Sequence, residues 1–193
     1  LSAINATLAA AGGLSYTSNS SFSGTETLTV SASDLGNNVS GTTQTASQNM
    51  SITVVAPPTI TATTTTFTDK QGGTLAITGM SIADSAILAT SNNVQVTLTA
   101  TNGNIALSTS VSGGLTSSQI TGNSSTSVTI NAPLAAINAT LAATNGLTYT
   151  PTSTTFGGTD TLNVTVSDLG HTASGVAQTA AKSITITVAG PLL

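Results

Sequence analysis

Charge and cysteine are what this sequence of 193 residues has least of. It contains no cysteine and no arginine, and its two lysines and six acidic residues give a net charge of −4 with 4% charged residues. Without cysteine, the chain has neither a disulfide framework nor a thiolate metal site. Two cationic side chains cannot form the basic surface that binds nucleic acid, so we expect no nucleic-acid partner.

Long hydrophobic runs are also missing. No apolar run approaches the roughly 18 residues of a membrane-spanning helix, so the sequence predicts no membrane span. Residue 1 is Leu, and the N-terminal segment lacks the basic start and apolar stretch of a secretory leader. We therefore expect a mature or excised piece of a larger protein.

Hydroxyl side chains are abundant, with 41 Thr and 26 Ser. Hydrophobic residues make up 38% and the mean hydropathy is +0.30, which is enough to build a folded core. Apolar residues alternate with Thr, Ser, Asn or Gln in several segments, which predicts half-buried strands whose outer face carries β-branched Thr. These segments are 75–77, 94–100, 128–130, 147–149, 162–166 and 184–188.

An internal repeat organises the chain. Residues 1–57 recur as residues 134–191 with one inserted residue, and 33 of the 57 aligned positions are identical. The repeating unit is about 134 residues long, so the chain holds the second half of one unit followed by one whole unit. We expect residues 1–56 to be the C-terminal half of one repeat, an incomplete sandwich, and residues 57–193 to be one complete repeat.

The predicted fold class is all-β, with antiparallel β-sandwich repeats of immunoglobulin-like type and one short helix per repeat. The helix is expected at LAAINATLA, where Leu134, Ile137 and Leu141 lie at helical spacing. The alternative for a Thr-rich chain is a parallel β-helix, which would show periods of roughly 20–30 residues that this sequence lacks. Pro57 and Pro58 fall where one unit passes to the next.

The repeated segment resembles a known family. The pieces LAAINATLA, LTYTP, GTDTL and SDLG, in that order, resemble the tandem cadherin-like repeats of very large secreted bacterial surface proteins, including RTX-type adhesins. DKQGGTLAITGMSIAD and VQVTLTATNGNIALS are similar in a looser way, so the resemblance spans nearly the whole chain. It implies an extracellular, rod-like tandem array on a bacterial surface that serves in adhesion, biofilm matrix or surface layers.

Calcium is the cofactor that this resemblance implies. In an immunoglobulin-like topology, Asp84 and Asp168 fall at the pole where the chain enters the repeat, and Asp69 is a further candidate ligand. Ca²⁺ prefers six to eight oxygen ligands, several of them carboxylates, whereas these acids are isolated in the sequence. The alternative is that Asp34 and Asp168 cap the turns of their S-D-L-G segments through Asx-type bonds to the backbone.

The chain offers no catalytic constellation, so we expect it not to be an enzyme. The one histidine, His171, lies three residues after Asp168, and Asn37 stands at its position in the other copy. That exchange indicates a solvated turn residue and not a general base. No segment resembles a nucleophile elbow or a Gly-rich phosphate cradle.

The shortage of charge favours a structural role. Two lysines leave the strand edges without the charged residues that usually prevent pairing with other chains. We therefore expect a module of a fibre, surface layer or adhesin stalk whose partners are copies of itself or neighbouring repeats. Strands from a neighbour would complete the unfinished sheet of residues 1–56, and head-to-tail contacts of this kind give filaments.

The alternative is a calcium-dependent adhesion or carbohydrate-binding module that recognises a cell-surface glycan. Sugar sites need aromatic platforms, and the whole repeat offers only Phe67, Tyr149 and Phe156, two of which lie in a core-like pattern.

Overall fold

The computed structural model describes residues 1–19 and 22–190. It divides into two units, Leu1–Val54 and Val55–Leu193. The boundary lies just before Pro57 and Pro58, in a stretch without strand or helix. Of the helices in the described part of the chain, none has the length and apolar character for a membrane crossing.

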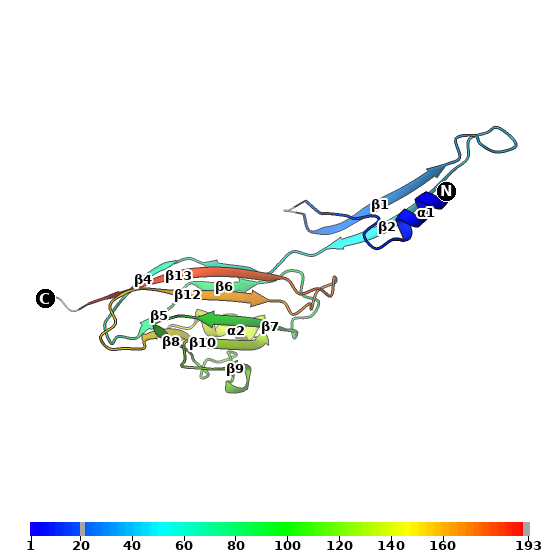
Figure 1. The fold of residues 1–193 in the computed structure, drawn as a ribbon. Coiled ribbons are helices and arrows are strands. Elements are labelled where there is room, and N and C mark those ends of the chain that lie inside the picture. Colours follow the sequence, from blue (N-terminus) through cyan, green and yellow to red (C-terminus); the bar gives the residue numbers. More distant parts are fainter. Residues whose placement is uncertain (20–21, 191–193) are drawn as a thin grey trace. The chain divides into compact units, whose positions relative to one another are not determined.

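The larger unit is a β-sandwich with one short helix (Figure 1). Its strands form a six-stranded sheet of order β4-β13-β12-β7-β10-β9, a three-stranded sheet of order β5-β11-β8 and a β3-β6 pair. This confirms the predicted all-β sandwich. The elements are β3 (Thr59–Ala62), β4 (Thr66–Lys70), β5 (Leu75–Ala76), β6 (Met80–Ala83), β7 (Asn93–Thr99), β8 (Gly103–Leu107), a 3₁₀ turn (Ser117–Gln119), β9 (Ile120–Thr121), β10 (Ser127–Pro133), α2 (Leu134–Ala142), β11 (Leu147–Pro151), β12 (Gly158–Ser167) and β13 (Thr179–Ala189).

The core of this sandwich follows from the period-two pattern. Along β7, Val94, Val96 and Leu98 are buried, while the residues between them are half-buried. The apolar residues of β12 and β13 are buried in the same alternation, and they pack with residues of β8, β10 and β11 into one cluster. Thr, Asn and Ser occupy most of the outward positions of β12, which accounts for the abundance of hydroxyl residues.

The pairing is antiparallel except at one edge. β4 runs parallel to β13, with Phe67 opposite Ile186. The pattern missed β3, β4, β8 and β9. These strands have two to five residues, too few for an alternating pattern to stand out in a Thr-rich sequence.

Helix α2 confirms the predicted short helix. Ile137, Thr140 and Leu141 are its buried residues. Its Asn138 amide binds the backbone of the neighbouring strand β6, donating to the Ile82 carbonyl at 2.7 Å and accepting from the Ile82 N–H at 2.9 Å. One side chain thus satisfies both backbone groups of a buried strand residue.

Within residues 1–19 and 22–54, the smaller unit contains counterparts of three of these elements. They are α1 (Ser2–Ala9), β1 (Gly24–Ser33) and β2 (Thr45–Val54), which match α2, β12 and β13. β1 and β2 form an isolated antiparallel pair with Gly24 opposite Val54, and Gly158 lies opposite Val188 in the same register. Residues 14–18, the counterpart of β11, form no strand, because residues 1–54 include no counterpart of β5 and β8, with which β11 pairs.

We call residues 57–133 the front half of a repeat and residues 134–190 its back half. Residues 1–54 are then a back half whose front half the sequence does not include.

Candidate functional site

Asp168 caps a tight turn at the end of β12. It is fully buried, and its Oδ1 accepts from the backbone N–H of Gly170 at 2.9 Å and of Gln178 at 2.7 Å. Asp34 makes the same two bonds at its own S-D-L-G turn. The predicted Asx-type capping is therefore confirmed in both copies. Hydrogen bonds from the backbone of Gln44 and Gly36 hold the pKa of Asp34 below its usual range.

Asp84 lies in a loop next to the Asp168 turn. Its Oδ1 accepts from the Ala86 N–H at 2.9 Å, and the two loops join where Ile87 and Thr172 form a β-bridge. The structure therefore places Asp84 and Asp168 at the same end of the sandwich, as predicted.

Asp69 lies at the other end. It stands opposite Val188 on β13, whereas Asp168 follows the far end of β12. A ten-residue strand separates these ends by roughly 30 Å, so our grouping of Asp69 with the other two acids was wrong. The error arose because we had not recognised β4, whose parallel register fixes the position of Asp69.

Each of these three aspartates has a buried Oδ2 without a hydrogen-bond partner. Within residues 1–19 and 22–190, however, no three His, Cys, Asp or Glu side chains converge as a metal site. The first copy offers another explanation for Asp168, because the Oδ2 of Asp34 accepts from the Asn38 amide at 2.6 Å. Thr172 stands at the position of Asn38 in the second copy and lacks that donor. The calcium site stays a prediction.

His171 is more integrated than a solvated turn residue. Its side chain is half-buried, and Nδ1 lies 2.9 Å from the Asn93 carbonyl at the start of β7. The residue lies in a turn as predicted, with its backbone N–H bonded to the Asp168 carbonyl, but its ring is not fully solvated. The histidine holds a strand end in position.

A buried polar pair lies beside the β7–β8 turn of the larger unit. The Tyr149 hydroxyl donates to Asp160 Oδ2 at 2.9 Å, and the same carboxylate accepts from the backbone N–H groups of Thr101 and Asn102. Burial is the main cause that raises the pKa of Tyr149, followed by the Asp160 hydrogen bond and the charges of Asp160 and Asp69. The pair fixes the β7–β8 turn to the back half.

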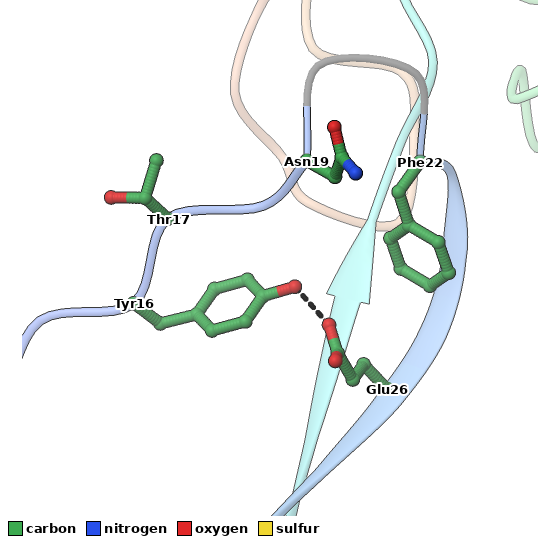
Figure 2. A pocket seen from close by; sticks show the side chains of 5 residues that line it. All are labelled: Tyr16, Thr17, Asn19, Phe22 and Glu26. Carbon is green, nitrogen blue, oxygen red and sulfur yellow. Dashed lines mark hydrogen bonds between the residues drawn. The ribbon is translucent and has the colours of Figure 1, made fainter.

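The corresponding pair in the smaller unit faces an open hollow. Tyr16 donates to Glu26, which replaces Asp160, and this bond is the main cause that raises the pKa of Tyr16. The hollow has a volume of about 350 Å³ and is lined by Tyr16, Thr17, Asn19, Phe22 and Glu26. Figure 2 shows the phenol and the carboxylate meeting across it, with the Phe22 ring alongside.

The same apolar side chains are buried in one copy and exposed in the other. Ile4 is 59% exposed and Ile137 0%, Leu8 is 51% and Leu141 2%, Tyr16 is 40% and Tyr149 0%, and Met50 is 43% while its counterpart Ile184 is 1%. Isolated exposed apolar residues are common, whereas this matched set extends over one helix, the segment that follows it and one hairpin. We call it the open face: Ile4, Leu8, Leu14, Tyr16, Phe22, Val30 and Met50.

Sequence reasoning did not identify the open face residue by residue. The repeat alignment contains the necessary information. Where a residue of the second copy is covered by the front half, its counterpart in residues 1–54 has no front half to cover it. Applying this information required knowing which back-half residues contact the front half, and only the structure shows this.

Comparisons with known proteins assign no family. No known family and no curated protein matches the chain. One solved structure with some likeness is AggA, the major subunit of aggregative adherence fimbriae type I from Escherichia coli. It is 17% identical with a TM-score of 0.32, and the match covers 70% of this chain and 97% of that one.

Proposed function

We propose that this chain is a non-enzymatic structural module of an extracellular bacterial surface protein, part of a fibre, surface layer or adhesin stalk built from cadherin-like repeats. The observation that carries the proposal is the repeat. One sequence occurs twice, and its second copy forms the back half of a complete sandwich. A chain made of consecutive sandwiches provides length and stiffness and needs no catalytic or ligand-binding site to do so.

Surface chemistry supports this role. Charged residues make up 4% of the chain, and Thr and Ser cover the outward strand positions, so neighbouring copies meet little charge repulsion. The aromatic side chains of residues 55–190 are Tyr149, which is buried, and Phe67 and Phe156, which pack against the core. None of the three is free to form a sugar platform, which favours the structural role over glycan binding.

The finer proposal is that neighbours complete residues 1–54. The lone β1–β2 pair and the open face provide strand edges and apolar surface for such a contact. We expect the chain 1–193 to associate with rising concentration in sedimentation velocity, and residues 55–193 alone to remain monomeric. Dispersed monomers of the full chain at high concentration, seen also in electron micrographs, would remove the self-assembly proposal.

Location is testable separately. Antibodies raised against residues 55–193 should label the outside of intact bacterial cells that carry the protein. Labelling that appears only after the cells are lysed would contradict an extracellular role.

Calcium-dependent adhesion is a second candidate, favoured by the unpartnered Oδ2 atoms of Asp84 and Asp168 in adjoining loops. If a cation binds there, residues 55–193 should melt at a higher temperature in the presence of calcium than in the presence of a chelator. Equal melting temperatures would remove this candidate.

A further inference from the structure

We infer that residues 1–54 form a specific binding site for an additional front half, a polypeptide with the pattern of residues 57–133. We further infer that Asn5, Thr7 and Glu26 recognise its backbone. This rests on the proposed role of residues 1–54 as an unfinished module. Each hollow of the smaller unit corresponds to a place that the front half fills in the larger unit.

The hollow at Tyr16 and Glu26 corresponds to the place of the β7–β8 turn. In the larger unit, Asp160 accepts from the N–H of Thr101 at 3.3 Å and of Asn102 at 2.9 Å. A Cβ on Gly103 would lie 1.8 Å from the Tyr149 ring, so the ring requires glycine there. The Glu26 hollow is therefore suited to a T-N-G turn. Its carboxylate has lone pairs for two backbone donors beside the Tyr16 bond.

A second hollow of about 300 Å³ lies on α1, lined by Ala3, Ile4, Thr7 and Leu8. At the counterpart of Thr7, the Thr140 Oγ1 accepts from the Leu115 N–H at 2.8 Å in a buried bond. A Cβ on Gly114 would lie 2.6 Å from that oxygen, so a Gly-Leu pair fits closely over the threonine. Thr7 donates to the Ala3 carbonyl and so keeps its oxygen lone pairs available for such a donor.

Asn5 supplies a third recognition point. Its counterpart Asn138 binds both backbone groups of Ile82 on β6. Asn5 is exposed, and α1 matches α2 in sequence and in the backbone of its C-cap. Three polar groups spread over a helix and a strand thus match three separate backbone segments of one front half. Non-specific apolar contact does not require that match.

The contacts of the existing front half identify the occupant. Residues 57–133 already contact α2, β12 and β13 of their own module, so a second copy would have to release these contacts before its front half could cover residues 1–54. An additional front half has no such contacts to break, and we therefore assign it as the occupant.

The test is a chain in which a second copy of residues 57–133 directly precedes Leu1. Peroxide oxidation followed by mass spectrometry compares Met50, which is 43% exposed, with Met80, which is 5% exposed and reports folding of the existing module. At concentrations where both chains are monomeric, we expect Met50 to oxidise at least about tenfold more slowly in the extended chain, because susceptibility follows exposure.

Asn5→Leu in the extended chain should remove much of that protection while Met80 stays protected. Val39→Ser is the matched control, because Val39 and its counterpart Ala173 are both exposed, and it should leave Met50 protected. Unchanged oxidation of Met50 in the extended chain would overturn the inference. Protection that rises only with concentration would also overturn it, because the open face would then belong to a second copy. Association of the unextended chain in sedimentation is a separate result, so each proposal can fail without the other.

Discussion

Tyr149 and Asp160 show at the residue scale how this chain stabilises a buried polar group with little charge. The carboxylate accepts from the Tyr149 hydroxyl and from the backbone of Thr101, Asn102 and Thr161. It therefore needs no cation, since four donors satisfy it. A buried carboxylate with this many partners is the kind of network that fixes one arrangement of a loop.

This pair predicts a loss of stability at high pH. The pKa of Tyr149 is raised in the folded state, mainly by burial and then by Asp160. The stabilisation is complete below the ordinary tyrosine pKa of about 10 and falls as the pH rises above it, because the unfolded chain ionises first. Tyr149→Phe should cost about 1–3 kcal/mol at pH 7 through the lost hydrogen bond. It should also flatten the decline in unfolding free energy from pH 8 to 11, measured with urea.

Tyr16→Phe is the control for that experiment. Tyr16 belongs to the open face, so its replacement should leave the unfolding free energy of the larger unit and its pH dependence unchanged. If the unfolding free energy of Tyr149→Phe depends on pH as that of the wild type does, the buried phenol does not cause the loss of stability at high pH.

A second residue-scale prediction concerns the unpartnered oxygen of Asp168. Thr172→Asn copies the Asn38 amide, which reaches the Oδ2 of Asp34 at 2.6 Å, and threonine and asparagine have similar volumes. We expect the variant to stabilise residues 55–193 by about 0.5–1.5 kcal/mol in chelator, measured by urea unfolding. A lower unfolding free energy in chelator would contradict the explanation that a donor is missing.

At the scale of elements, the two copies show what local sequence determines without tertiary contacts. Both helices end at an alanine with nearly the same backbone angles, φ −74° with ψ 144° at Ala10 and 145° at Ala143. A Cβ on Gly13 or Gly146 would strike the carbonyl of Thr7 or Thr140, so both copies require glycine after the helix. Helix, turn and hairpin register are therefore encoded locally, whereas strand β11 forms only where β5 and β8 are present.

The paired helices give a matched mutational test. Asn138→Leu leaves both backbone groups of buried Ile82 unpaired and should cost about 2–4 kcal/mol in the unfolding of residues 55–193. Asn5→Leu changes the same residue in the same local sequence where no front half lies against it, and it should leave that unfolding free energy unchanged. Equal effects of the two variants would show that the cost lies within the helix and not in its contact with β6.

The elements also show how far sequence reasoning reached. Long alternating strands and the helix were predictable because β12, β13 and α2 repeat their apolar residues at strand and helix spacing. The short strands β3, β4, β8 and β9 were not, because their burial depends on which neighbour covers them. The position of Asp69 depended on β4 and was missed with it, and the open face depended on contacts between halves that no local pattern carries.

At the scale of the whole molecule, the two copies of one sequence differ in whether a front half covers them. Residues 134–190 have a front half and bury their apolar side chains, whereas residues 1–54 expose the same side chains. Local stability should follow this difference. The amide hydrogens of a buried strand exchange with solvent only when its whole module opens, whereas those of an uncovered hairpin do not need that opening.

Amide hydrogen exchange on the dilute, monomeric chain measures this most directly. We predict that amides of α2, β12 and β13 exchange slowly through global opening of their module. The aligned amides of α1, β1 and β2 should exchange faster by at least about a thousandfold, which corresponds to roughly 4 kcal/mol of stability at 1.4 kcal/mol per factor of ten. Equal protection of the two copies would contradict the account, because it would mean that residues 1–54 are stable without a front half.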